Sequence, residues 1–66
     1  MHIILNGESH AFEGGATVAI LVEQLGLVGQ RLAVEVNGEI VPRGEHATHV
    51  LHEGDKVEVV RAIGGG

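Results

Sequence analysis

The stretch Val36-Asn37-Gly38-Glu39-Ile40-Val41-Pro42-Arg43 decides the fold. Its Asn-Gly pair is a strong hairpin signal, because both central positions of the favoured two-residue turn require φ > 0. A shorter strand over 39–41 should follow and end at Pro42, which cannot donate to a β-ladder. Before the turn, large apolar residues occupy every second position over 31–36. This alternation predicts a half-buried strand with the side chains of Leu32, Val34 and Val36 on one face.

A second Asn-Gly pair, Asn6-Gly7, predicts another hairpin near the start of the chain. The strands that it joins should cover residues 1–5 and about 8–12, since the first is rich in branched apolar residues. Successive side chains of a strand point to opposite faces. Ile4 should therefore point outward if Ile3 and Leu5 face the core.

Residues 18–25 predict a short amphipathic helix, because its apolar residues fall at i, i+3, i+4 and i+7. Thr17 is the expected N-cap, and Gly26 stands where a left-handed residue ends a helix. The apolar stripe consists of Val18, Leu21, Val22 and Leu25.

The remainder of the chain predicts a final strand. Residues 43–51 have no clean period and are expected to hold one helical turn, and Glu53-Gly54-Asp55 is expected to form a turn. Lys56 to Ile63 should be the last strand, with Val57 and Val59 facing the core. The whole order predicts an α+β roll in which one helix packs on a mixed sheet of four to five strands.

Size and charge restrict the class of function. A chain of 66 residues supports one small domain with little room for a deep catalytic pocket, which favours a binding or carrier module. The net charge is −5, and four Lys and Arg residues supply all fixed positive charge, so nucleic acid is not an expected partner. A basic protein surface is a more plausible partner.

Cysteine is absent, which removes disulfides, thiol nucleophiles and thiolate metal ligands from the chain. The apolar run at the N-terminus, residues 3–5, is far too short for a signal peptide or a spanning helix. We therefore expect a cytoplasmic protein without a membrane partner.

The sequence ends at Ile63-Gly64-Gly65-Gly66. Glycine loses more conformational entropy on folding than any other residue, so three successive glycines do not suit a packed strand or helix. We expect a folded domain over residues 1–63 and a flexible glycine tail over residues 64–66. A glycine terminus has no side chain to obstruct its last carbonyl, so a narrow enzyme channel could admit it. A frayed end or an expression scar is the alternative.

Taken together, these features resemble the ubiquitin-like β-grasp family and, within it, the ThiS sulfur carriers of thiamine biosynthesis. Family members often carry an aromatic residue after the Pro-Arg pair, where this chain has His46 or a neighbour. The resemblance covers nearly the whole chain and is carried, besides the tail, by residues 1–8, Ala16-Thr17-Val18 with Leu21 and Leu25, residues 36–43, and residues 53–60.

The resemblance implies a carrier cycle. A ubiquitin-activating-enzyme-like adenylyltransferase would consume ATP and join AMP to the carboxylate of Gly66. Sulfur from a cysteine desulfurase or another persulfide donor would displace AMP, and the resulting thiocarboxylate would pass its sulfur to thiazole synthase. The chain would bind no cofactor and would be a substrate of these enzymes, not a catalyst.

Partner recognition should involve the tail and an outward-facing aliphatic patch on the sheet. Gly65, Gly64 and Ile63 would enter the partner, while Ile4 and Val60 should point away from the helix on neighbouring strands. Scattered surface aliphatics are the ordinary alternative.

His46, His49 and His52 recur every third residue, yet we expect no metal site. Neither a helix nor a strand would keep all three on one face, and no Cys completes a ligand set. We expect surface polar residues and one packed imidazole at most.

Two other functions fit the same residues. The first is the small sulfur-carrier subunit of molybdopterin synthase, which uses the same terminal chemistry. The second is a non-carrier β-grasp binding module whose glycines are inert.

Overall fold

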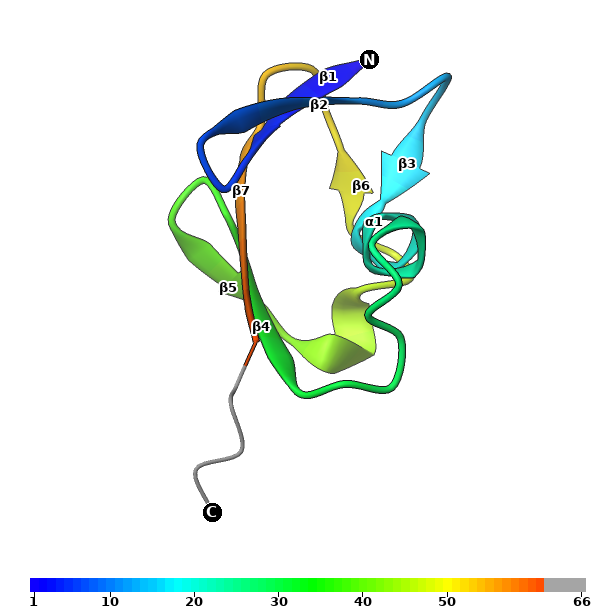
Figure 1. The fold of residues 1–66 in the computed structure, drawn as a ribbon, viewed down its shortest axis with the longest axis vertical. Coiled ribbons are helices and arrows are strands. Elements are labelled where there is room, and N and C mark those ends of the chain that lie inside the picture. The colour runs from blue at the N-terminus through cyan, green and yellow to red at the C-terminus, as the bar shows by residue number, and fades with distance from the viewer. Residues whose placement is uncertain (62–66) are drawn as a thin grey trace.

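The structure is a computed structural model that describes residues 1–61. These residues form two layers, a twisted sheet and an α-helix that packs across one of its faces (Figure 1). The strands are β1 (His2–Leu5), β2 (Glu8–Ala11), β3 (Ala16–Thr17), β4 (Leu32–Val36), β5 (Glu39–Val41), β6 (Val50–Leu51) and β7 (Lys56–Arg61), and the helical elements are α1 (Val18–Gln24) and the 3₁₀ turn η1 (Arg43–Glu45).

The main sheet has five strands in the order β2-β1-β7-β4-β5. β1 and β7 run parallel, whereas the pairs β1–β2, β4–β5 and β4–β7 are antiparallel. The predicted α+β fold with a mixed sheet of four to five strands is therefore confirmed. β7 occupies the middle of the sheet, between the two hairpins that the Asn-Gly pairs predict.

A second, two-stranded sheet was not predicted. In it, β3 pairs antiparallel with β6, with Ala16 opposite Leu51 and Thr17 opposite Val50. The segment 43–51 therefore holds the expected helical turn, η1, and also a strand that begins at residue 50. A strand of two residues is too short to show the alternation of apolar and polar residues that predicts a strand, which is why this sheet was missed.

The core lies between the main sheet and α1 and is aliphatic apart from one ring. The alternation predicted for the strands is confirmed, because Val34, Val57 and Ile3 are fully buried while Ile4 and Val60 are exposed. The buried apolar residues are Ile3, Phe12, Ala16, Val18, Leu21, Val22, Val34, Val36, Val41, Leu51, Val57 and Val59.

The start of α1 is capped by its own N-cap and by a distant segment. The Thr17 hydroxyl accepts from the Ile20 N–H at 3.3 Å, as the sequence predicts. The two preceding N–H groups of the helix donate to the carbonyls of His49, at 3.0 Å, and His46, at 2.8 Å. The irregular segment after η1 thus satisfies donors that a helix leaves unpaired at its first turn.

The end of α1 forms a Schellman motif at the predicted glycine. Gly26 has φ 71°. Its N–H donates to the Glu23 carbonyl at 3.0 Å, and the Leu27 N–H donates to the Val22 carbonyl at 3.1 Å. This 5→2 and 6→1 pair is the usual way in which a left-handed residue satisfies the last carbonyls of a helix.

Both hairpin asparagines also bind the central strand. Asn6 and Asn37 have positive φ, 49° and 52°, as the turns require. The Asn6 side chain accepts from the Val59 N–H at 2.9 Å and donates to the Val59 carbonyl at 3.3 Å. The Asn37 side chain accepts from the Lys56 N–H at 2.9 Å. An amide suits these positions because it tolerates positive φ and offers a donor and an acceptor.

Asp55 completes the turn before β7. Its carboxylate accepts from the His52 N–H at 2.8 Å and from the Asn37 amide at 3.0 Å. Burial of Asp55 acts to raise its pKa, but these hydrogen bonds, together with the nearby His52 and His49, outweigh burial and lower the pKa below its ordinary value of 3.8.

We expect Asn6→Gly to reduce the free energy of unfolding by about 1–2 kcal/mol, because glycine keeps the positive φ but loses both bonds to Val59. Asn6→Ala should lose more, since alanine is also strained at this φ. Urea denaturation of the three proteins measures both differences. Equal stability of Asn6→Gly and the unsubstituted protein would contradict the role given to the amide.

Asp55→Asn should be less stable than the unsubstituted protein at neutral pH. Because the folded-state pKa of Asp55 is lowered, its contribution is fully present above pH 3.8 and is lost as the pH falls through the folded value. The stability difference should therefore disappear in strong acid. Denaturation at a series of pH values tests this, with Glu23→Gln on the helix as the control; a difference that is independent of pH would contradict it.

Candidate functional site

The central strand β7 immediately precedes, in the sequence, the C-terminal residues on which the carrier hypothesis rests. It ends at Arg61, opposite Leu32 at the start of β4. Figure 1 shows that this point lies at the end of the molecule away from residue 1. Ile63 and the three predicted tail glycines, 64–66, lie outside the described residues, as does the predicted boundary between domain and tail.

Ile4 and Val60 lie on the outer face of the sheet, as expected, but they do not adjoin. Ile4 is 38% exposed and lies opposite Lys56, whereas Val60 is 60% exposed and lies opposite Ala33. Four residues along β7 separate the two positions, about 13 Å at roughly 3.3 Å per residue. The two residues therefore share a face without forming one continuous patch.

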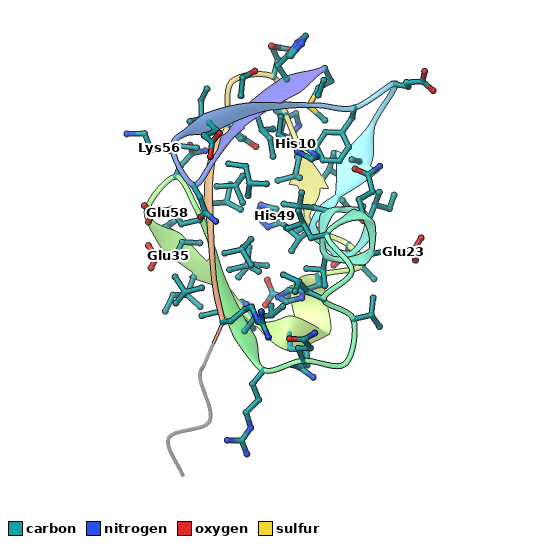
Figure 2. All side chains as sticks on the ribbon, in the orientation of Figure 1. His10, Glu23, Glu35, His49, Lys56 and Glu58 are labelled. Carbon is teal, nitrogen blue, oxygen red and sulfur yellow. The ribbon has the colours of Figure 1, made fainter. Side chains whose placement is uncertain are left out.

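The neighbours of Val60 come from β4 and β5. Ala33 lies opposite Val60, and Glu35 lies opposite Glu58 on one side and Ile40 on the other. Ile40 is 69% exposed. Figure 2 shows the side chains of Glu35 and Glu58 on the side of the sheet away from α1. Sequence reasoning missed Ile40, although the inward position of Val41 in the same strand required Ile40 to point outward.

The three histidines that recur every third residue have separate surroundings. The imidazole of His46 donates from Nε2 to the Val41 carbonyl at 3.1 Å, while His52 Nδ1 lies 4.0 Å from the Asp55 carboxylate. His49 is half-buried. Within residues 1–61, no three His, Cys, Asp or Glu side chains gather as a metal site would require.

A shallow hollow of about 280 Å³ lies beside His46. Arg43 borders it and donates from Nη2 to the Gln30 carbonyl at 2.9 Å. The other residues that line it are mostly apolar: Ala19, Val22, Leu27, Val28, Gly29, Leu32 and Ala47.

The described residues form no catalytic constellation. Between residues 1 and 61, side chains hydrogen-bond to one another at His10–Gln24 and Asn37–Asp55, and neither pair joins a nucleophile to a base. The part of the chain that the structure describes has no helix long and apolar enough to cross a membrane.

A five-stranded mixed sheet with a parallel central pair, covered on one face by one helix, defines a β-grasp protein of the ubiquitin-like class. The ThiS family model matches residues 3–66, which include the glycines, and the chain belongs to this family. ThiS proteins are sulfur carriers of thiamine biosynthesis, and this chain has the sequence and the fold of such a carrier.

Individual relatives agree with this assignment. The chain is 35% identical to the sulfur carrier protein ThiS of Escherichia coli, over the full length of both. A crystal structure of the thiamine biosynthesis protein ThiS from Geobacter metallireducens superposes with a TM-score of 0.84 at 29% identity and full coverage of both chains. The chain is also 42% identical to a thiazole synthase of Paramagnetospirillum magneticum, of whose length it spans only 20%.

We expect Zn²⁺ to leave the melting temperature of the untagged protein unchanged, because His46, His49 and His52 do not converge. Thermal melts with equimolar Zn²⁺ and with excess EDTA test this expectation. A rise in melting temperature that His46→Ala abolishes would contradict it.

Proposed function

We propose that the carboxylate of Gly66 is the site that carries sulfur. The observation that supports this most directly is the family match, which extends through the glycines to residue 66. Since the described part of the chain has neither a nucleophile–base pair nor a thiol, the chemistry falls to partner enzymes that act on the terminus.

The first step is activation. A carboxylate is a poor electrophile because it would have to expel an oxide, so its oxygen must first attack the α-phosphate of ATP and release pyrophosphate. The resulting acyl adenylate carries AMP as a good leaving group. A ubiquitin-activating-enzyme-like adenylyltransferase supplies the ATP site, and the carrier itself binds no cofactor.

The second step is the entry of sulfur. The terminal sulfur of a persulfide, held by a cysteine desulfurase or another donor, attacks the carbonyl and displaces AMP. A second thiol then cleaves the S–S bond, leaving a thiocarboxylate on Gly66 and a disulfide on the partner. Both thiols belong to partners, because this chain has no cysteine.

The thiocarboxylate then delivers its sulfur to a thiazole synthase. The support is that a protein named thiazole synthase contains a segment similar to this whole chain, which places carrier and synthase in one polypeptide in that relative. We place the cycle in the cytoplasm, where ATP is available.

Partner enzymes hold the carrier at two places in this proposal. Ile63, Gly64 and Gly65 enter the active-site channel, which suits residues with small or no side chains. Val60 and Ile4 contact the enzyme from the outer face of the sheet, as two separate points because of the distance between them.

The two alternatives receive no comparable support. The matching family model and the full-length Escherichia coli relative belong to the ThiS branch, not to molybdopterin synthase. A binding module with inert glycines does not account for a family match that runs through residue 66.

Intact-mass analysis tests the proposal. The protein is incubated with ATP, an adenylyltransferase of this family, a cysteine desulfurase and cysteine, and it should gain the mass of one oxygen-to-sulfur exchange. The mass of the starting protein verifies that Gly66 carries a free carboxylate. Deletion of Gly65 and Gly66 should abolish the exchange completely.

Glu23→Gln, on the helix side of the molecule, is the matched control and should react like the unsubstituted protein (Figure 2). No mass gain by the unsubstituted protein, with enzymes that modify the Escherichia coli carrier in parallel, would refute the proposal.

A further inference from the structure

The two hairpin turns carry a chemically reactive sequence as well as a turn signal. Both read aliphatic-Asn-Gly-Glu, at Leu5-Asn6-Gly7-Glu8 and Val36-Asn37-Gly38-Glu39. In an Asn-Gly pair the backbone nitrogen of the glycine can attack the asparagine side-chain carbon, because glycine has no Cβ to obstruct the approach. Since the neighbours of the two asparagines match, their intrinsic reactivity should be similar. Any difference between the two turns must then come from the fold.

The attacking nitrogens are not engaged in the folded protein. Within residues 1–61, neither Gly7 nor Gly38 donates its N–H to a carbonyl. Apart from the chain neighbours, no heavy atom lies within 4 Å of the position that a Cβ on either glycine would take. Asn6 and Asn37 are both exposed to water. The nucleophile and the water that the reaction needs are therefore present at both turns.

The asparagine side chains, by contrast, are held at both amide atoms. Asn37 accepts from the Lys56 N–H at 2.9 Å and donates to the Asp55 carboxylate at 3.0 Å. Asn6 makes both of its bonds to Val59, at 2.9 and 3.3 Å. An amide held in this way cannot turn its carbon toward the following nitrogen until the bonds break. The fold therefore restrains both asparagines, but through different partners.

We propose that Asn37 is a site of spontaneous deamidation that Asp55 and Lys56 keep closed, and that its modification releases the start of β7. The Gly38 nitrogen bonds to the side-chain carbon of Asn37, and the amide nitrogen leaves as ammonia, which carries away the proton of the Gly38 N–H. Water then opens the cyclic imide at one of its two carbonyls and leaves aspartate or isoaspartate. The reaction needs only water and involves no change of oxidation state.

Both products disrupt the contact that held the asparagine. The amide nitrogen of Asn37 lies 3.0 Å from Asp55 Oδ1, so an aspartate in its place would set two carboxylates against each other. Isoaspartate also adds an atom to the backbone of a turn whose length fixes the register of β4 with β5. A chain that is modified while it is open therefore cannot restore the closed turn.

Asn37 is the more consequential of the two sites because of the group that its amide nitrogen faces. The Asn6 amide nitrogen donates to the Val59 carbonyl, which is neutral. A carboxylate at that turn would lose a hydrogen bond without meeting another charge. The inference does not depend on the proposed function, since it concerns the turns and β7 alone.

Peptide mapping by mass spectrometry measures the deamidation rate at each turn, in the folded protein and in urea at the same pH. In urea the two sites should react at similar rates, and folding should slow each by about tenfold or more. In the folded protein, Asp55→Ala should speed the reaction at Asn37 by about tenfold and affect Asn6 much less. Asn6 is the internal control, because a general loss of stability would speed both sites equally.

Asn37→Asp reproduces the aspartate product and tests its effect on the fold. Its melting temperature should be about 10 °C below that of the unsubstituted protein. Asn37→Asp/Asp55→Asn returns an amide donor to the pair at unchanged net charge, so it should recover about half of this loss. Asn6→Asp is the matched variant in the other turn; it should cost less stability, and Asp55→Asn should not rescue it.

Equal deamidation rates at Asn37 in the folded and the unfolded protein would overturn the proposal. Equal acceleration of both sites by Asp55→Ala would refute the role of Asp55. If Asp55→Ala does not fold, the rescue of Asn37→Asp by Asp55→Asn decides that role instead. An Asn37→Asp variant as stable as the unsubstituted protein would show that modification leaves β7 in place, contrary to the proposal.

Discussion

The structure depends on the pairing of β7 along both of its edges. β4 pairs with it over five residue positions, whereas the parallel register with β1 covers only Ile4–Lys56 and Leu5–Val57. The Asn6 side chain extends this short parallel contact by two hydrogen bonds to Val59, and Asn37 with Asp55 fixes the start of the strand. A strand held in this way buries Val57 and Val59 beneath α1 and determines which β7 side chains reach the outer face.

Features that depend on neighbouring residues could be predicted from the sequence. The Asn-Gly turns, the cap at Thr17, the left-handed Gly26 and the outward side of Ile4 and Val60 each follow from local preferences or from a short period. The short β3–β6 sheet could not be predicted, since it joins residues more than thirty positions apart. The separation of Ile4 from Val60 depends on the register of a parallel pair, which nothing in either strand specifies.

The same limit applies to the candidate site. The glycine tail was predicted from the residues themselves, whereas its sulfur chemistry came from the resemblance, and the comparisons support the family to which that chemistry belongs. The opposition of Glu35 and Glu58 became visible only when the β4–β7 register was known.

A central strand that comes last in the described chain also constrains biosynthesis. During translation the first hairpin, the helix and the second hairpin all leave the ribosome before residues 56–61, yet β1 and β4 each lack one sheet neighbour until those residues arrive. Closing contacts between such distant segments is slow relative to local folding. The domain consequently has no complete core until residues 56–61 have been synthesised, and any product that stops before them lacks the strand that joins its two hairpins.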